Sequence, residues 1–248
     1  MPMDMKRSPG EVVIPLIVRL PPAVILVGGL GTRLKSVVSD RPKAMAVVAG
    51  KPFLTHQLEW LHTNEVGSVL LCVGYKGQQI VDYIGDGSHL GLVVSYSWEN
   101  TPLGTAGALA KAMELLPEEF LVINGDTFTT LPLGPLWEAH HHNGAIATLA
   151  VTTSEDSSAV GGIELAADGR ITSFREKESG AQLVSMGIYA ISRRIATFIP
   201  KKRPCSLEND VFPYLPSLYG HVAKEPFIDI GTPTGYLAAD VYLSRLGE

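Results

Sequence analysis

A glycine-rich segment near residue 30 carries a hydroxyl and a cation. Its residues, which follow the apolar run 23–27, are Gly28, Gly29, Leu30, Gly31, Thr32 and Arg33. Glycines let backbone N–H groups approach phosphate oxygens and tolerate positive φ angles. Lys43 adds a second cation a short distance along the chain. One hydroxyl and two cations beside such a loop favour a concentrated anion, of which a triphosphate is the natural example.

Two common phosphate-binding motifs do not fit this segment. It lacks the Gly-Lys-Ser/Thr ending of a Walker A loop, and Leu34 stands where a dinucleotide fingerprint has its third glycine. A nicotinamide-dependent oxidoreductase also needs a ribose-binding acid after the second strand, and Val73-Gly74-Tyr75 supplies none. For the loop taken alone, a tight turn with incidental surface cations remains the alternative.

Two aspartates lie at or near the ends of apolar runs. Asp126 comes after the run 120–123, and in an open α/β sheet this end of a strand faces the crevice where ligands bind. Asp229 lies inside the run 226–230, where we expect it to be buried and in need of a cation or strong donors. A shared Mg²⁺ suits both carboxylates, because it prefers hard oxygen ligands and bridges phosphates. The alternatives are a turn-forming Asp126 and a capping or core-paired Asp229.

Short apolar runs alternate with helical patterns from Ala23 onward. This alternation predicts an α/β fold with a Rossmann-like, mostly parallel mixed sheet flanked by helices. In the first part we expect strands at 23–27, 68–73, 92–97 and 120–123, and helices at 53–66, 77–84 and 104–116. Beyond Ala145 we expect a more antiparallel arrangement, with strands at 145–151, 160–165, 171–175, 183–191 and 226–230. Thr232 and Pro233 predict the start of the last helix, as N-cap and first helical residue.

The composition argues against several classes of partner. A formal net charge of −5 and a pI of about 5.8 give no overall basic surface for nucleic acid. No apolar stretch reaches the ~18 residues of a membrane span, and prolines interrupt residues 1–22, which we expect to be an extension. Cys72 and Cys205 are too few for a disulfide framework. We therefore expect a cytoplasmic protein with neither a polynucleotide nor a membrane partner.

Several segments together resemble the signature of the sugar-1-phosphate nucleotidyltransferases. The longest runs from Ala23 to Leu34 and is followed by Arg41-Pro42-Lys43-Ala44-Met45. Further similar segments are Lys51-Pro52-Phe53-Leu54, Pro102-Leu103-Gly104-Thr105-Ala106-Gly107, Asn124-Gly125-Asp126, Glu176-Lys177 and Phe227-Ile228-Asp229-Ile230-Gly231-Thr232-Pro233. The resemblance covers nearly everything from Ala23 to the end. It implies a nucleotide-diphospho-sugar transferase fold with Mg²⁺ as cofactor.

The resemblance also implies roles for particular residues. It assigns catalysis to Arg33, Lys43 and Asp126, and Mg²⁺ binding to Asp126 and Asp229. The residues expected at the nucleotide are Val27, Gly28, Gly29, Gly31, Thr32, Arg33, Lys43, Tyr75, Glu99, Gly104 and Thr105. Those expected at the sugar phosphate are Gly162, Glu176, Lys177 and Gly187. The alternatives are close helix packing for Gly104 and a solvated ion pair for Glu176 and Lys177.

The same resemblance implies one nucleotidyltransferase domain over residues 23–248, after the extension 1–22. Its nucleotide half is expected at about 23–150 and its sugar-phosphate half at about 151–248. No hexapeptide repeat is present in the sequence, so no C-terminal β-helix is expected. A homo-oligomer is compatible with the sequence.

Within the family, the interval from Arg33 to Lys43 and the continuation 50–54 look most like the guanylyltransferases that make GDP-D-glycero-α-D-manno-heptose. The implied reaction transfers GMP from GTP to the heptose 1-phosphate, releases pyrophosphate and supplies cell-surface glycan synthesis. A mannose 1-phosphate guanylyltransferase or a relative that uses UTP or dTTP is the near alternative. A non-catalytic subunit that only binds nucleotide sugars is the alternative from another class; such a subunit is expected to have lost a lysine or a metal aspartate, and this chain keeps them.

Overall fold

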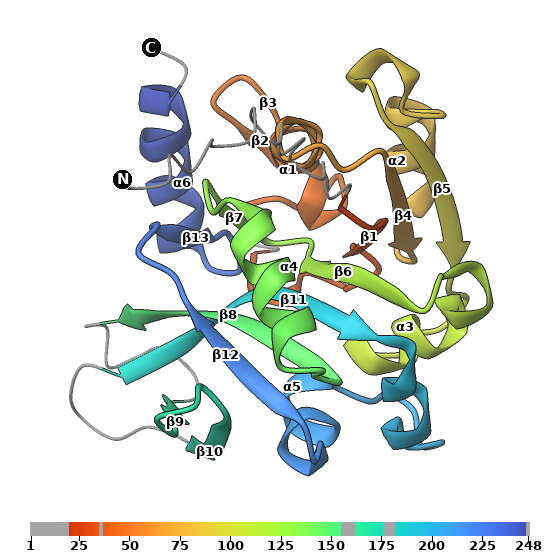
Figure 1. Ribbon diagram of the computed structural model, residues 1–248. Helices are drawn as coiled ribbons and strands as arrows, with labels where there is room; N and C mark the ends of the chain where they lie inside the picture. Colours follow the sequence, from red (N-terminus) through yellow and green to blue (C-terminus); the bar gives the residue numbers. More distant parts are fainter. Residues whose placement is uncertain (1–19, 35–36, 155–161, 176–181, 247–248) are drawn as a thin grey trace, which may run out of the picture.

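Strands from both halves of the chain share one sheet of nine strands in the computed structural model, which describes residues 20–34, 37–154, 162–175 and 182–246 (Figure 1). Its parallel part has the order β5-β4-β1-β6. These strands are β1 (Ala23–Leu26), β4 (Ser68–Val73), β5 (Val93–Trp98) and β6 (Glu119–Asn124). The inner three are apolar runs, as parallel strands covered on both faces require, whereas the edge strand β5 alternates between exposed and buried residues.

The other strands of the large sheet lie beyond β6. The long strand β11 pairs antiparallel with β6 and with β8, β12 pairs parallel with β8, and β9 links β11 to β10. These strands are β8 (Ala147–Ser154), β9 (Gly162–Leu165), β10 (Ile171–Arg175), β11 (Gln182–Ser192) and β12 (Leu218–Val222). The pairing of β11 with β8 shifts register between Ser185 and Tyr189, around Gly187, which has a φ of +71°.

Two small two-stranded sheets lie near the carboxyl ends of the parallel strands. β7 (Thr127–Thr129) directly follows β6 and pairs antiparallel with β13 (Phe227–Asp229), so a segment near the chain end lies beside Asp126. β2 (Val47–Val48) and β3 (Lys51–Pro52) form a hairpin shortly after Lys43. This hairpin contacts the last helix, in which the Tyr236 hydroxyl donates a hydrogen bond to the Val47 carbonyl at 2.6 Å.

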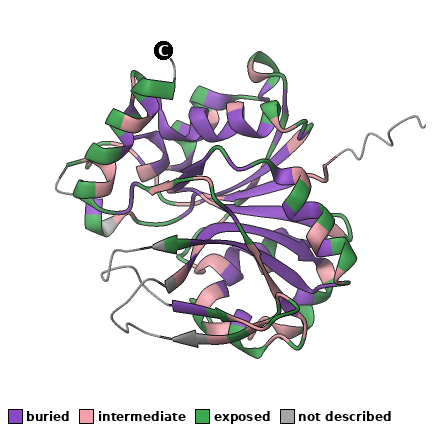
Figure 2. Cartoon of the chain, turned by 60° about the vertical axis from the view of Figure 1, so that its left-hand side comes forward, coloured by how far each residue is buried: buried purple, intermediate pink, exposed green. Residues whose placement is uncertain are grey.

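Helices cover both faces of the sheet, because side chains of a strand alternate between its two faces. Ala23 and Ile25 of β1 belong to one apolar core and Val24 to the other. The first core receives side chains from α1 (Phe53–Thr63), α2 (Gly77–Ile84), α4 (Leu133–His142) and α6 (Pro233–Leu246). The second receives them from α3 (Thr105–Ala112) and α5 (Leu207–Asp210). Figure 2 shows the buried strands between helices whose outer surfaces are exposed.

The predicted fold class is confirmed, and most expected elements are present with shifted ends. The expected helix 104–116 is shorter, because Gly104 has a φ of +75° and the α-helix gives way to a 3-10 helix at Met113–Leu115. The expected N-cap Thr232 does accept a hydrogen bond from the Gly235 amide, at 3.1 Å. None of the helices in the described part of the chain is long and apolar enough to cross a membrane.

Candidate active site

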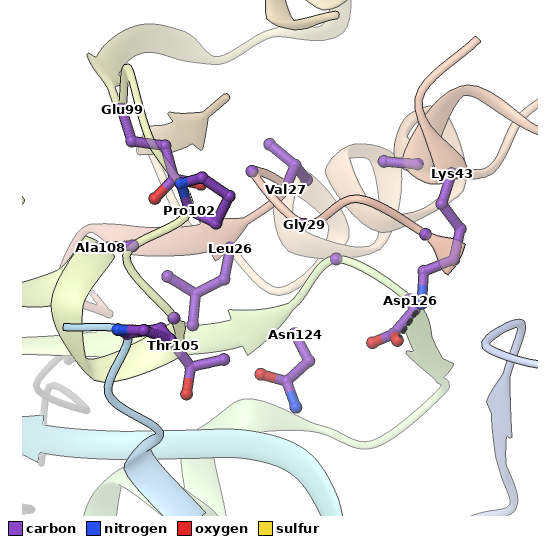
Figure 3. A pocket seen from close by; sticks show the side chains of 16 residues that line it. Leu26, Val27, Gly29, Lys43, Glu99, Pro102, Thr105, Ala108, Asn124 and Asp126 are labelled. Atoms are coloured by element: carbon purple, nitrogen blue, oxygen red, sulfur yellow. Dashed lines mark hydrogen bonds and ion pairs between the residues drawn. The ribbon is translucent and has the colours of Figure 1, made fainter. Parts of the chain in front are cut away.

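A cleft of about 330 Å³ opens at the carboxyl ends of β1 and β6 (Figure 3). The strand order changes direction here, since β4 lies on one side of β1 and β6 on the other. This is where open α/β sheets bind ligands, and the volume suits a small-molecule ligand. The cleft is lined by Leu26, Val27, Gly28, Gly29, Gly31, Lys43, Ala44, Glu99, Pro102, Gly104, Thr105, Ala108, Asn124, Gly125, Asp126 and Pro204.

The glycine-rich segment forms one wall of the cleft. Gly31 has a φ of +58°, a conformation that L side chains rarely adopt. Gly28 is needed for a different reason, because a Cβ there would lie 2.2 Å from Oε1 of Glu99. The glycines therefore leave this wall of the cleft with little side-chain cover, and the phosphate-binding role expected for the segment stays a prediction. The side chain of Thr32 lies outside the described part of the structure.

An ion pair between Lys43 and Asp126 lies at the far end of the cleft (Figure 3). Lys43 begins a short 3-10 helix after Pro42, and Asp126 follows β6 by way of Gly125. Both side chains are largely buried, with exposed fractions of 19% for Lys43 and 23% for Asp126. The pair places one cation and one carboxylate beside the glycine-rich segment. This arrangement can neutralise phosphate charge or hold a metal ion.

Asp229 lies beside Asp126 but is not buried as its apolar strand suggested. The pairing of β13 with β7 brings the two together, and the Ile230 amide donates a hydrogen bond to the Asp126 carbonyl at 2.9 Å. Asp229 ends the short strand β13 and its side chain remains open to solvent, which corrects the expected burial. Partial desolvation by the surrounding protein, and then the neighbouring Asp126 carboxylate, raise the pKa of Asp229. Two neighbouring carboxylates, both negative when ionised, repel each other and so fit a divalent cation.

Glu99 presents its carboxylate at the opposite end of the cleft (Figure 3). It follows β5, and its amide donates to the Val73 carbonyl at 2.8 Å. The Leu103 backbone N–H donates to the carboxylate, whereas Oε2 is buried and has no hydrogen-bond partner within the described ranges. Burial raises the pKa of Glu99. A buried acceptor without a donor is unfavourable unless a ligand supplies one.

The structure gives the other predicted nucleotide residues different positions. Gly104 and Thr105 line the cleft, and Gly104 also has the packing role expected as its alternative, because a Cβ there would lie 2.4 Å from the Cys205 carbonyl oxygen. Tyr75 and Arg33 are exposed and do not line the cleft. Nη2 of Arg33 lies near Gly231, which places the guanidinium close to Asp229 rather than deep in the cleft.

Of the predicted sugar-phosphate residues, the two that the structure describes, Gly162 and Gly187, do not line the cleft. Gly162 is buried at the start of β9, in register with Arg175 of β10. Gly187 lies against Asn124, because a Cβ on Gly187 would lie 2.9 Å from Nδ2 of that residue. Glu176 and Lys177 fall outside the described residues.

Several residues that line the cleft were not predicted as site residues, and Asn124 and Pro204 are two of them. Asn124 precedes the predicted metal ligand Asp126 by two residues, and its position at the end of a buried strand is the signal that marks it. Pro204 comes from the segment before α5 and reaches the cleft only through tertiary packing. No local pattern in the sequence indicates it.

Comparisons with known proteins agree with this geometry. The family model for nucleotidyl transferases matches residues 22–245. A D-glycero-alpha-D-manno-heptose 1-phosphate guanylyltransferase of Aneurinibacillus thermoaerophilus is 36% identical, over 90% of this chain and 98% of its own length. A mannose-1-phosphate guanylyltransferase of Mycobacterium tuberculosis is 35% identical over 90% of this chain, which spans 64% of the length of that relative.

A solved structure gives the same result in three dimensions. HddC from Yersinia pseudotuberculosis, crystallised with GMP-PN, is 32% identical and matches with a TM-score of 0.80 over 90% of this chain and 100% of its own. The matches in sequence and in structure thus extend over nearly the whole described chain. The resemblance indicated by the motifs is confirmed, and the chain belongs to the nucleotidyl transferase family.

Proposed function

We propose that this chain is an enzyme that transfers GMP from GTP to D-glycero-α-D-manno-heptose 1-phosphate and releases pyrophosphate. The observation that carries the proposal is a cleft that combines the glycine-rich segment, the Lys43–Asp126 pair and a Glu99 oxygen without a partner among the described residues. Full-length similarity to a heptose 1-phosphate guanylyltransferase supports this acceptor. Mannose 1-phosphate is the second candidate, supported by the mycobacterial relative.

Guanine is the base that the Glu99 carboxylate suits. An ionised carboxylate only accepts hydrogen bonds, and the Watson–Crick edge of guanine offers two adjacent donors, N1–H and the N2 amino group. Uracil and thymine offer one N–H between two carbonyl oxygens, which a carboxylate repels. Oε2 of Glu99 is the buried acceptor that such a donor would satisfy. The GMP-PN bound to HddC is consistent with a guanine nucleotide in this family.

Mg²⁺ is the proposed cofactor, and Asp126 and Asp229 are the residues that would hold it. Their neighbouring carboxylates are hard oxygen ligands, and a bound cation would offset the repulsion between the two negative charges. The chemistry that Mg²⁺ supplies when bound is neutralisation of charge on the phosphate oxygens.

The proposed reaction is an in-line displacement at the α-phosphorus of GTP. A phosphate oxygen of the sugar 1-phosphate forms the new P–O bond, and the bond from the α-phosphorus to the oxygen bridging to the β-phosphate breaks, so pyrophosphate leaves with both electrons. Lys43, held in place by Asp126, would stabilise negative charge at the α-phosphate. Arg33 would contact the departing phosphates. Lys177 is proposed to bind the acceptor phosphate on the basis of its sequence motif.

The proposed function also has a cellular setting. We propose that the protein works in the cytoplasm, where nucleoside triphosphates are available, and that residues 23–248 act as one domain. Cys72 and Cys205 are buried and free, as a reducing compartment allows.

A matrix of substrates tests the proposed function. Pyrophosphate release is measured for GTP, ATP, CTP, UTP and dTTP against heptose, mannose and glucose 1-phosphates. We expect GTP with heptose 1-phosphate to give the highest kcat/KM. A maximum with mannose 1-phosphate would favour the second candidate, and a maximum with UTP or dTTP would contradict the base assignment. Nucleotide-sugar binding without turnover anywhere in the matrix would identify a non-catalytic subunit.

Binding of Mg²⁺ can be tested without turnover. In the presence of GTP, millimolar Mg²⁺ should raise the Tm of the protein by several degrees, and Asp229→Asn should remove most of that rise. The rise should also shrink as pH falls, because a carboxyl with a raised pKa keeps its proton to a higher pH and the metal must displace it. Asp82→Asn, an exposed change on α2, is the matched control. An undiminished rise in Asp229→Asn would remove Asp229 from the metal site.

A further inference from the structure

Asn124 is a polar side chain of the cleft to which the proposed reaction assigns no role. It ends β6, and in Figure 3 it lies between Thr105 and Asp126. Its Oδ1 is buried and has no hydrogen-bond partner in the described part of the chain. Buried side-chain acceptors in proteins nearly always have a donor, so an unpaired one at a ligand cleft indicates a donor that arrives with the ligand.

The amide nitrogen of Asn124, Nδ2, has two hydrogen-bond partners in the protein. Nδ2 lies 3.4 Å from the Tyr189 hydroxyl and 3.4 Å from Oε1 of Glu208. The Tyr189 hydroxyl donates its own hydrogen to the same Glu208 oxygen at 2.8 Å, and burial raises the pKa of Tyr189 well above its usual value, so it remains a neutral donor. Both neighbours therefore accept from Nδ2.

Glu208 decides which end of the amide faces the ligand. An ionised carboxylate has no hydrogen to donate, so a flipped amide would place Oδ1 against a negative charge. Its second oxygen is held as well, by Ser206 Oγ at 3.0 Å and Thr105 Oγ1 at 3.3 Å. The carboxylate is thus fixed by three hydroxyls, from β11, from α3 and from the N-cap of α5, and it keeps the acceptor end of Asn124 turned away from itself.

The groups that hold Asn124 come from the half of the chain expected to bind the sugar phosphate. Tyr189 lies on β11 and Glu208 on α5. Gly187, also on β11, has no Cβ and so allows the amide its position. Glu99, the proposed contact of the base, lies after β5 on the other side of the cleft. Asn124 therefore stands where the acceptor sugar would meet the nucleotide.

We propose that Asn124 determines sugar specificity by accepting, at Oδ1, a hydrogen bond from a hydroxyl of the sugar 1-phosphate, and that Glu208 is the positioning residue that fixes this orientation. The inference rests on the proposed function. The chemistry required of the ligand is a hydroxyl donor, which a sugar and the ribose of the nucleotide both possess. The arrangement of β11 and α5 around Asn124 favours the sugar.

The test compares kcat/KM for the preferred sugar 1-phosphate and for analogues that each lack one hydroxyl, in wild type, Asn124→Leu and Glu208→Gln. In wild type, removal of the recognised hydroxyl should lower kcat/KM about tenfold or more. In Asn124→Leu the analogue that lacks this hydroxyl should lie within about threefold of the unmodified sugar 1-phosphate. Parallel measurements with 2′-deoxy-GTP and 3′-deoxy-GTP examine the ribose.

Glu208→Gln tests the orientation separately, because a glutamine amide can donate to Oδ1 of Asn124 and so permits the flipped form. We expect the KM for the sugar phosphate to rise about three- to tenfold, with kcat and the KM for GTP changed less than about twofold. Asn209→Ala, an exposed change on the same short helix, should behave as wild type. If Asn124→Leu has a lowered Tm and little folded protein, the KM of Glu208→Gln for the sugar phosphate decides the question, and an unchanged KM would overturn the inference.

The outcomes distinguish this inference from the proposed function. A wild-type enzyme that turns over no sugar 1-phosphate would contradict both the proposed function and the role of Asn124. An active wild type together with an Asn124→Leu variant that discriminates equally well among the sugars would overturn the inference alone. Loss of discrimination between GTP and its deoxy forms, with the sugar series unchanged, would also overturn it, since the hydroxyl read by Asn124 would then belong to the ribose.

Discussion

Replacement of Asp126 by alanine should lower the rate of pyrophosphate release by about three orders of magnitude or more, because the change removes two functions at once. It removes one of the two proposed metal ligands, and it removes the carboxylate that orients Lys43 beside the glycine-rich segment. The backbone of Asp126 keeps its own structural role, since the carbonyl that accepts from the Ile230 amide is unchanged. The fold should therefore persist while the chemistry is lost.

The measurement is single-turnover pyrophosphate release at saturating GTP, sugar 1-phosphate and Mg²⁺, together with the Tm of each variant. Asp82→Ala, an exposed aspartate on α2, is the matched control and should retain the wild-type rate. Activity of Asp126→Ala within tenfold of wild type at saturating Mg²⁺ would contradict the assignment. A variant that lost activity together with more than about 10 °C of Tm would point to a damaged fold and would require Asp126→Asn instead.

The cleft was predictable where a continuous motif supplies its residues. The glycines, Lys43 and Asp126 each follow an apolar run or lie in a short motif, and parallel strands bring such ends to one edge of the sheet. The parallel half of the sheet was predictable for the same reason, because buried strands such as β4 and β6 are unbroken apolar runs.

Features that depend on short pairings between distant segments were not predictable. β7 has three residues and pairs with β13, about a hundred positions further on, so neither has enough residues for a periodic pattern. That pairing is also why Asp229 ends a strand at the solvent, although the apolar residues around it suggested burial. The contact between Asn124 and Glu208 likewise depends on tertiary packing, since the two are 84 positions apart.

Replacement of Glu99 by glutamine should lower kcat/KM for GTP about 100-fold, because the neutral amide loses one of two charge-assisted acceptors for the guanine edge. The same change should raise kcat/KM for UTP and dTTP relative to GTP, since an amide can accept from N3–H and donate to the neighbouring carbonyl oxygen. The carboxylate packs against Gly28 and Gly74, where a Cβ would lie 2.2 Å and 2.7 Å from Oε1, and glutamine has the same shape. The phosphate contacts should therefore be unaffected.

The pH dependence separates base recognition from a general loss of structure. Burial raises the pKa of Glu99, so the acceptor pair is present above that pKa and is lost as pH falls through it, at a higher pH than for an ordinary glutamate. In wild type, kcat/KM for GTP should fall on acidification with an inflection at this raised pKa, whereas Glu99→Gln should lack that inflection. Glu114→Gln, an exposed change, should keep the wild-type profile. Identical pH profiles and an unchanged preference among the five triphosphates in Glu99→Gln would show that the base is recognised elsewhere, because the variant has no ionisable carboxylate at this position.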